Sequence, residues 1–506
     1  ALLLAAGVAV EATASREVVA ASTPADSSDT LRVAVAIYNR GRTPVAVERL
    51  VPSQLRMGNT VPDVRATILP DSAWQDSVPV VPVAITTQWW RRSGRPNDLF
   101  LEAPDGRTEE ERSASVESGA LRIGGRLRIA GAEVGASAPV VQRFADPVRG
   151  EVQRPVAVVP GVTLRLDRST QYVRAGRPVN RPIRVTLRSA YARPRRVSVE
   201  LSLPPGLVGD SLRRIVTLPP NGQAELQFVL RGALLEGRHL MGALATVLPD
   251  SFSASPARYM DGSATIAYDH IPPQRLYFPA ASRITAVPVE LPPNAVVGYV
   301  AGVGDNVAPR LSELDLPVSL LDPATLDRAD LSRYTTIVIG PRAYEAHPAL
   351  AANNARLLDW TRRGGTLVVQ YGQYEMTQPG IMPYPITLGR PAARVTREDA
   401  PVTALDPRAR VLTAPNRLTS EDWRGWVQER SLYMPSTFDR TYRPMLELHD
   451  PGEPENRGAL LVAPYGRGTY VYTTLALFRQ LPAGHPGAAR LFVNLIGAGG
   501  RQSAPR

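Results

Sequence analysis

The chain has 506 residues, 44% of them apolar and 21% charged, as in ordinary globular proteins, and this length favours two to four domains. Cysteine is absent, which excludes disulfides, thiolate metal ligands and a cysteine nucleophile. The net charge of +11 comes from arginine without lysine and is spread along the chain, so it argues against a nucleic-acid-binding protein.

The first 28 residues begin with a short apolar run, ALLLAAGVAV, followed by EATAS. The run resembles the apolar part of a signal peptide, but no basic segment precedes it, and it is too short to span a bilayer. We therefore expect residues 1–28 to be the remnant of a preceding helix and linker, cut from a longer polypeptide. No other stretch of the sequence predicts a membrane span.

Two β domains are expected next. Residues 29–51 alternate apolar and polar side chains on both sides of the turn NRGRTP, and residues 121–134 repeat the pattern around a Gly-Gly turn. Residues 29–160 are therefore predicted to form a β-sandwich. Residues 161–270 contain several short strand patterns and the turn LPPNG, which together predict an immunoglobulin-like sandwich.

The pattern changes after residue 270. Residues 271–294 are rich in proline and are predicted to be an extended linker. In residues 295–499, short apolar strands alternate with helical segments such as the amphipathic 347–365, which predicts an α/β domain with a parallel sheet. The last residues, 500–506, are expected to be a loose tail.

Loops that follow parallel strands are the expected place for a pocket in such a sheet. The segment GVGDN contains Gly302, Gly304 and Asp305; it follows a strand and opens a helix, a geometry that presents backbone N–H groups to an anion, although the third glycine of a dinucleotide fingerprint is missing. The turn GPRAY after the next buried strand contributes Arg342 and Tyr344. It offers no nucleophile, so acyl transfer is not expected there.

More polar and aromatic residues are expected near the same edge of the sheet. The further candidate ligand-binding residues are Gln370, Tyr371, Trp426, Gln428, Glu429, Arg430, Asp450, Glu453 and Arg479. A sugar or anion site is the functional interpretation of this group. Salt bridges that only support the loops are the alternative.

The segment DWRGWVQERSLYMP (422–435) is rich in aromatic residues although the whole chain is only 6% aromatic. Thr419 and Asp422 have the spacing of a capping box just before it. Its Trp and Tyr faces suit sugar rings, but they equally suit a lid over a core. We expect the two Trp to pack in the core or between domains, and Gln428, Glu429 and Arg430 to be the better functional candidates.

No metal site and no catalytic residue are predicted within this chain. The five histidines are far apart in the sequence, and neither an HExxH motif nor a G-x-S-x-G motif occurs.

The last part of the chain contains VVGYVAGVGDNVAPRLSELDLPVSLLD, LLDWTRRGGTLVVQYG, APNRLTSEDWRGWVQERSLYMP and HDPGEPENRGALLVAPYGRGTYVYTTL. With DPVRGEVQRPVAVVPGVTLRLD (146–167), these segments resemble the C-terminal region of long bacterial PIG-L (LmbE-like) deacetylases. The resemblance implies two immunoglobulin-like sandwiches followed by an α/β flavodoxin-like domain similar to class I glutamine amidotransferases and ThuA-like proteins. The family's zinc site rests on an HPDD-type motif that this sequence lacks, so a zinc cofactor is expected only in a preceding domain outside this chain.

The resemblance implies a non-catalytic accessory region of a sugar de-N-acetylase, with a periplasmic or secreted location. Its expected partners are the N-terminal deacetylase domain of the same polypeptide and a glycan; no nucleic acid is expected. One alternative is a ThuA-like carbohydrate-active enzyme that uses carboxylates at the sheet edge. The other is a purely structural spacer or assembly module.

Overall fold

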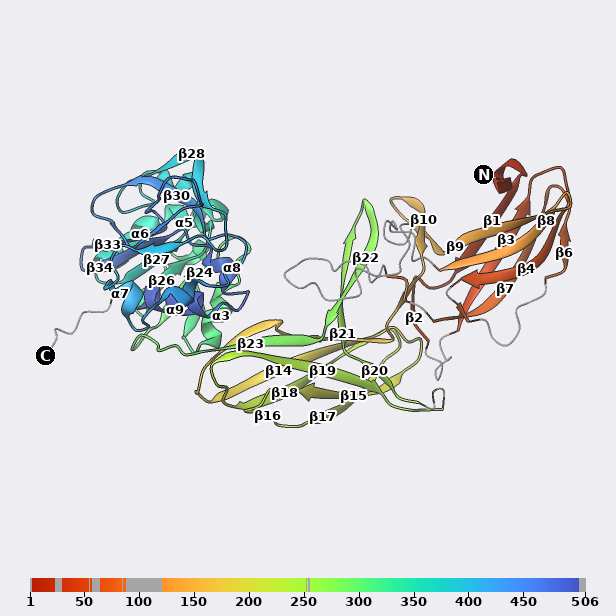
Figure 1. Ribbon diagram of the computed structural model, residues 1–506, viewed down its shortest axis with the longest axis horizontal. Coiled ribbons are helices and arrows are strands. Elements are labelled where there is room, and N and C mark those ends of the chain that lie inside the picture. Colours follow the sequence, from red (N-terminus) through yellow and green to blue (C-terminus); the bar gives the residue numbers. More distant parts are fainter. Residues whose placement is uncertain are drawn as a thin grey trace.

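The computed structural model describes residues 2–22, 30–53, 55–56, 64–83, 85–87, 121–251, 253 and 255–499. The chain forms three lobes in sequence order: a β lobe at the N-terminal end, a second β lobe in the middle, and a lobe that holds the helices of the C-terminal half (Figure 1). The predicted tail, 500–506, lies outside the described residues.

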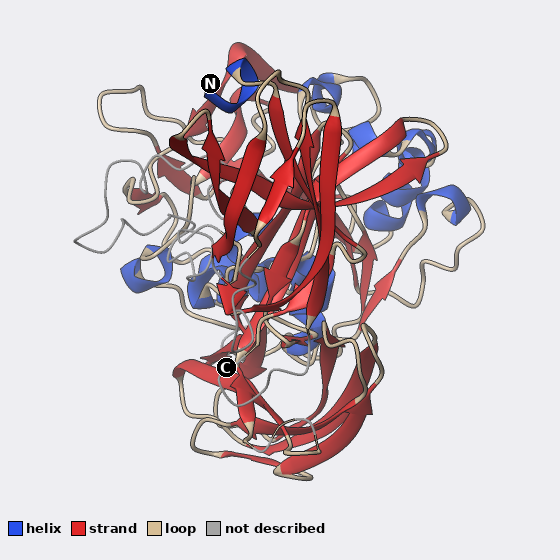
Figure 2. Cartoon of the chain, turned by 90° about the vertical axis from the view of Figure 1, so that its right-hand side faces the viewer, coloured by secondary structure: helices blue, strands red, loops and turns tan. Residues whose placement is uncertain are grey.

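The fold-class prediction of two immunoglobulin-like sandwiches followed by an α/β flavodoxin-like domain is wrong. The chain is β-rich, with about 48% strand and 13% helix, many separate sheets and a nearly closed barrel. Strands dominate the view along the long axis (Figure 2). The helical segments in the sequence are short, and sheet structure fills much of the chain between them.

The first lobe is a nine-stranded sheet that curls on itself. Its strands are β1 (Val8–Ala14), β3 (Leu31–Asn39), β4 (Val45–Ser53), β5 (Leu55–Arg56), β6 (Ala66–Ile68), β7 (Ser72–Pro82), β8 (Arg122–Ile129), β9 (Ala132–Asp146) and β10 (Gly150–Pro155). The order is β5-β7-β3-β1-β9-β8-β4-β6, with β10 on β9, and the two ends approach each other where β6 contacts β7. Alternate residues such as Val33, Val35 and Ile37 fill the interior, as a period of two requires.

The first 28 residues differ from the predicted helical remnant and linker. They contain helix α1 (Leu2–Ala5) and strands β1 and β2 (Val18–Ala20). In β1, Val8, Ala12 and Ala14 are buried, and the strand pairs antiparallel with β3 and parallel with β9. The sequence VAVEATA is too short and too alternating for a helix, and it holds the two halves of the barrel sheet together.

The second lobe packs a four-stranded sheet on a six-stranded sheet. The first contains β12 (Val162–Leu166), β14 (Val179–Ser189), β18 (Gln223–Gly232) and β16 (Leu207–Gly209). The second contains β13 (Thr170–Arg174), β23 (Ala281–Val287), β19 (Gly237–Val247), β15 (Arg195–Ser202) and β17 (Arg213–Leu218), with β20 (Ala257–Tyr259) on β19. A short parallel pair, β11 (Ala157–Val159) with β2, connects this lobe to the first.

The predicted proline-rich linker, 271–294, carries strands over much of its length. β22 (Ile271–Pro279) forms a hairpin with β21 (Asp261–Tyr268), and β23 lies inside the six-stranded sheet between β13 and β19. The hairpin stands out from the second lobe (Figure 1). Prolines fit in β22 because a strand paired on one side leaves alternate N–H positions without a partner.

The third lobe contains a seven-stranded sheet in the order β25-β24-β26-β27-β34-β33-β31. The strands are β24 (Val297–Val300), β25 (Val318–Leu320), β26 (Thr336–Ile339), β27 (Thr366–Gln370), β31 (Arg443–Pro444), β33 (Leu460–Tyr465) and β34 (Gly468–Thr473). The pairings from β25 to β34 are parallel, and β33 and β31 join through antiparallel pairings. Two small sheets lie beside it: β28 (Ile386–Val395) with β30 (Ser431–Phe438), and β29 (Val402–Ala404) with β32 (Leu446–Leu448).

Helices and alternating side chains build a core on each face of this sheet. The helices are α3 (Val307–Glu313), α4 (Ala343–Ala346), α5 (Pro348–Ala352), α6 (Asn354–Arg362), α7 (Arg410–Thr413), α8 (Leu477–Gln480) and α9 (Pro486–Ile496), with 3₁₀ turns η3 (Pro323–Thr325), η4 (Tyr374–Thr377) and η5 (Ser420–Trp423). In β26, Val338 belongs to the core that contains α9, whereas Ile337 and Ile339 belong to the core that contains α6. The sheet is thus buried on both faces, which explains its continuous apolar strands.

Candidate functional site

The parallel strands β24, β26, β27 and β34 all end at one edge of the sheet, here called the carboxyl edge. The segments that follow them are 301–306, 340–342, 371–374 and 474–479. Because parallel strands point the same way, the polar groups of these segments come together there.

The GVGDN loop is closed by its own carboxylate. Asp305 Oδ2 accepts hydrogen bonds from the Tyr299 hydroxyl at 2.8 Å and the Gly302 N–H at 3.0 Å, and Oδ1 accepts from the Val307 N–H at 3.0 Å. Asp305 therefore occupies two of the N–H groups predicted to bind an external anion, those of Gly302 and Val307, and the Val303 N–H donates to the Pro341 carbonyl. Gly304 has φ +62° and open space where a side chain would project, so it serves the turn.

Gln370 extends this network beneath the edge. Its Nε2 donates to the Tyr299 hydroxyl at 2.9 Å, and its side chain is 1% exposed. Burial and the neighbouring Asp305 carboxylate raise the pKa of the Tyr299 hydroxyl well above its ordinary value, so the hydroxyl stays protonated. Within the described residues, Gln370 Oε1 accepts no hydrogen bond.

The turn after β26 contains two of the candidate ligand-binding residues, Arg342 and Tyr344, which have different environments. Arg342 has φ +55°, donates its backbone N–H to the Tyr371 carbonyl at 2.8 Å, and pairs its guanidinium with Glu345. The hydrogen bonds in this pair raise the pKa of Arg342 and lower that of Glu345. Tyr344 is buried and donates its hydroxyl to Asn354 Oδ1 at 2.6 Å, so Tyr344 has a partner inside the lobe.

Four aromatic side chains gather at the carboxyl edge, here called the aromatic row: Tyr371, Tyr374, Tyr433 and Phe478. The Tyr371 ring stacks on Tyr433, with centroids 6.2 Å apart and planes at 17°, and lies 5.3 Å from Phe478. Tyr374 meets Tyr433 edge-on at 6.0 Å. Tyr371 is buried, while the other three rings are partly exposed.

Charged groups border the aromatic row. Arg479 lies over the Phe478 ring, 5.0 Å from its centroid, and pairs with Glu429 at 3.0 Å. Burial raises the pKa of the Tyr371 hydroxyl, and Arg342 and Arg479 act against this shift. Sequence analysis identified Tyr371, Glu429 and Arg479 but missed Tyr374, Tyr433 and Phe478. Tyr433 lay in the segment already singled out, and Phe478 follows a buried strand as Tyr371 does.

The segment 422–435 divides into a buried and an exposed part. Trp426 is 1% exposed and packs against Trp423 and His485, with centroids 5.7 and 5.9 Å away. Arg430 is 4% exposed; it donates to the carbonyls of Ala400 and Trp423 at 3.1 and 2.6 Å, and its burial lowers its pKa to about 10. Arg430 thus lies inside the lobe, with its donors turned to backbone carbonyls.

The remaining candidates hold loops. Gln428 is exposed and donates its backbone N–H to Glu398 Oε1 at 3.0 Å. Asp450 accepts from the Thr396 N–H and hydroxyl at 2.8 and 2.6 Å and from the Arg397 N–H at 2.9 Å. Burial alone would raise the pKa of Asp450, but these hydrogen bonds outweigh burial and lower it. Glu453 is exposed in the following turn, where its N–H donates to the Asp450 carbonyl.

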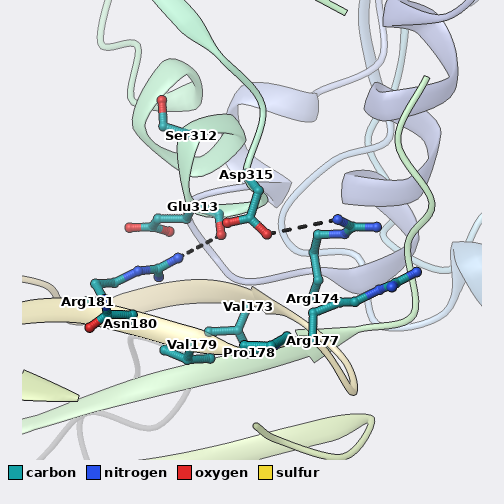
Figure 3. Close-up of a pocket in the computed structure, with 10 residues that line it drawn as sticks. All are labelled: Val173, Arg174, Arg177, Pro178, Val179, Asn180, Arg181, Ser312, Glu313 and Asp315. Carbon is teal, nitrogen blue, oxygen red and sulfur yellow. Dashed lines mark hydrogen bonds and ion pairs between the residues drawn. The ribbon is translucent and has the colours of Figure 1, made fainter. Parts of the chain in front are cut away.

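A polar cavity of about 180 Å³ lies between the second and third lobes, where the β13–β14 turn meets the end of α3 (Figure 3). Arg181 donates to the Glu313 carbonyl at 2.8 Å, and Arg174 approaches Asp315 at 4.0 Å. Glu313 is 6% exposed; burial raises its pKa, against the opposing charges of Arg310 and Arg181. The groups that face this cavity are largely engaged with one another and hold the lobes together.

Neither a metal site nor a membrane span is found among the described residues. No group of three or more His, Asp or Glu is placed to hold a metal ion in the part of the chain that the structure describes. In the same part, no helix has the length and apolar character needed to cross a membrane.

Comparisons with known proteins give little to add to this geometry. No family model matches the chain, and no curated protein matches it. Among solved structures, the β-galactosidase from Rahnella sp. R3 is similar with a TM-score of 0.24 and 14% identity, over 42% of this chain and 32% of that one. The chain therefore spans about a third of that enzyme's length.

Proposed function

We propose that this chain is a non-catalytic carbohydrate-binding module and that its ligand lies on the aromatic row at the carboxyl edge. The observation that carries the proposal is the group of partly exposed rings, Tyr374, Tyr433 and Phe478, around the buried Tyr371. Aromatic faces suit the C–H faces of a sugar ring, and nearby Arg and Glu side chains suit its hydroxyl edges.

The conformation of Tyr433 supports the same proposal. Its φ is +51°, a region that costs a residue with a side chain roughly 1–2 kcal/mol. Such strain persists only when the surrounding structure imposes it, and it is concentrated at functional sites. Tyr433 is one of several non-glycine residues with positive φ, and its ring joins Tyr371 to Tyr374.

The state of the carboxylates favours binding over catalysis. Asp305 accepts three hydrogen bonds from the chain itself, Asp450 accepts three, and Glu429 pairs with Arg479. A glycoside hydrolase needs a protonated and an ionised carboxyl group facing a shared substrate. Carboxylates held in this way are poor candidates for such a pair.

The resemblance to PIG-L deacetylases extends the proposal. In this interpretation the chain is an accessory region that holds a glycan for a zinc-dependent de-N-acetylase domain of the same polypeptide. The zinc belongs to that domain, which contributes the chemistry, while the three lobes described here bind and position the glycan.

A titration with a panel of neutral and charged oligosaccharides, followed by calorimetry, tests the proposal. We expect at least one sugar to bind, and Phe478→Ala to weaken that binding about fivefold, because aromatic–sugar contacts contribute on the order of 1 kcal/mol each. Tyr465→Ala is the matched control: Tyr465 is also partly exposed and contacts an arginine, Arg362, but it lies at the opposite edge of the sheet. Absence of binding by every sugar, or equal losses in both variants, would contradict the proposal.

A further inference from the structure

The two ends of the aromatic row differ in charge. At the Phe478 end, Arg479 is neutralised by Glu429 at 3.0 Å. At the Tyr374 end, Arg390 lies over the ring with its guanidinium carbon 4.1 Å from the centroid. Arg390 is exposed, and within the described residues its guanidinium has neither a hydrogen bond nor an ion pair.

The contact with Tyr374 restricts the orientation of the Arg390 guanidinium before any ligand binds. The Tyr374 hydroxyl donates to the Gly389 carbonyl at 3.2 Å, which ties the ring to the residue before Arg390. A guanidinium held over a ring face can keep its N–H donors free, and their fork matches the two oxygens of a carboxylate. Because the stacking limits the side chain's freedom, less entropy is lost when a carboxylate binds.

The other charged side chains near the aromatic row that the structure describes have partners of their own and do not pair with Arg390. Arg342 is paired with Glu345, and one oxygen of Glu375 accepts the Gln373 N–H at 2.8 Å. Among the described residues, Arg390 is therefore a cation at the row without an ion pair; it lies over Tyr374, whose ring contacts the partly exposed Tyr433. A sugar ring on Tyr433 that carried a carboxylate would have an arginine at the neighbouring ring to receive it.

We propose that the site takes an acidic saccharide of the uronic acid type, with the sugar ring on Tyr433 and its carboxylate on Arg390. This proposal rests on the proposed function, since it names the ligand class of the same site. It predicts that affinity depends on the carboxylate charge and that this dependence comes from a single arginine.

The test compares short oligogalacturonates, their methyl esters and neutral galacto-oligosaccharides by calorimetry on the full chain. We expect the acid to bind about tenfold more tightly than its methyl ester, as one charge-assisted bidentate contact requires. Arg390→Gln should weaken binding of the acid about tenfold and leave binding of the ester unchanged. Arg467→Gln is the matched control, because Arg467 is also exposed but lies in the β33–β34 turn at the opposite edge.

The outcomes separate the two proposals. If the ester and the neutral sugars bind as tightly as the acid, the proposal of an acidic ligand is wrong, but the proposal of a carbohydrate site is still supported. Equal losses of acid binding in Arg390→Gln and Arg467→Gln would also contradict the acidic-ligand proposal, since they would show that the acid is attracted by the protein's overall positive charge and not by Arg390. If no sugar of either kind binds, the proposed function itself fails. Thermal unfolding of each variant shows whether the fold is retained.

Discussion

His485 is a buried imidazole with both ring nitrogens in use. It is 2% exposed; Nδ1 accepts the Ala488 N–H at 3.1 Å as the N-cap of α9, and Nε2 lies 2.7 Å from the Arg424 carbonyl, to which it donates. This arrangement requires the neutral ring protonated at Nε2, since a protonated Nδ1 could not accept. Burial lowers the pKa of His485, with Arg238 and Arg430 acting in the same direction.

This lowered pKa predicts a loss of stability in mild acid. The unfolded chain takes up the proton near the ordinary pKa of about 6.5, whereas the folded chain takes it up only at lower pH, so the free energy of unfolding falls as pH drops below about 6.5. Above that value the contribution is constant. Urea unfolding at about pH 5 and about pH 7.5 measures the difference. His485→Asn keeps an N-cap acceptor and should show a smaller pH dependence than the wild type; an unchanged dependence would assign it to other groups.

Gly302 and Gly304 lie two residues apart, and glycine is required at each for a different reason. A side chain at Gly302 would collide with the Pro341 carbonyl, because the loops after β24 and β26 touch there. A side chain at Gly304 would meet open space, and only its φ of +62° opposes substitution. Gly302→Ala should therefore cost roughly 2–3 kcal/mol by forcing the loops apart, and Gly304→Ala about 1 kcal/mol. Denaturant midpoints compare the two; an equal or larger loss at Gly304 would show that the loops can separate easily.

At the scale of the element, the segment 422–435, here called the strap, runs across the third lobe and is fixed to it at several points. Its buried part is fixed by Trp426 and by Arg430, whose guanidinium lies 5.4 Å from the Trp426 ring and donates to two carbonyls. Gln480 closes the strap from α8: it accepts the Val427 N–H and donates to the Val427 carbonyl, both at 2.9 Å. Of residues 422–435, Arg424, Gly425, Val427 and Gln428 are exposed, whereas Glu429 is only partly exposed.

Neighbouring substitutions in this strap should have opposite consequences. Arg430→Ala leaves one buried and one partly buried carbonyl without their arginine donors, and a gap beside Trp426, so we expect a loss of roughly 2–4 kcal/mol in the free energy of unfolding. Glu429→Ala breaks one partly exposed ion pair and should cost less than about 1 kcal/mol. Chemical denaturation of both variants checks this order. If Arg430→Ala lowers the free energy of unfolding only slightly, Arg430 is not a structural support and is again a candidate for ligand binding.

The sequence predicts elements better than it predicts how they meet. Alternation marks strands such as Leu31–Asn39 because every second residue is buried. It carries no signal for barrel closure, since β1 pairs with β9 through partners as distant as Ala12 and Val140. The site shows the same limit. Tyr371 could be placed at the carboxyl edge because it follows β27, and Tyr374 lies three residues later in η4. Tyr433 approaches them only as part of β30, which pairs with β28 in a register that shifts at three places.

At the scale of the whole molecule, the second and third lobes share a core. Tyr172 on β13 and Val287 on β23 belong to the same buried cluster as α9 and β24. Across the junction the Tyr172 hydroxyl donates to the His485 carbonyl at 3.1 Å, and the Thr285 hydroxyl donates to the Gly484 carbonyl at 3.0 Å. Apolar burial and hydrogen bonds at one junction predict that the two lobes unfold together.

Tyr172→Ala tests this coupling. Removing a fully buried aromatic side chain should cost about 3–5 kcal/mol, and the loss falls on the junction because the side chain lies in the core of the neighbouring lobe. We expect differential scanning calorimetry to resolve two transitions for these lobes in the variant where the parent chain shows one. Phe228→Ala is the control, since Phe228 is as buried but lies within the core of the second lobe. That variant should keep one transition at a lower temperature, because the lobe is weakened while its coupling remains. Two transitions already in the parent chain would mean that the shared core is too small to make the lobes one cooperative unit.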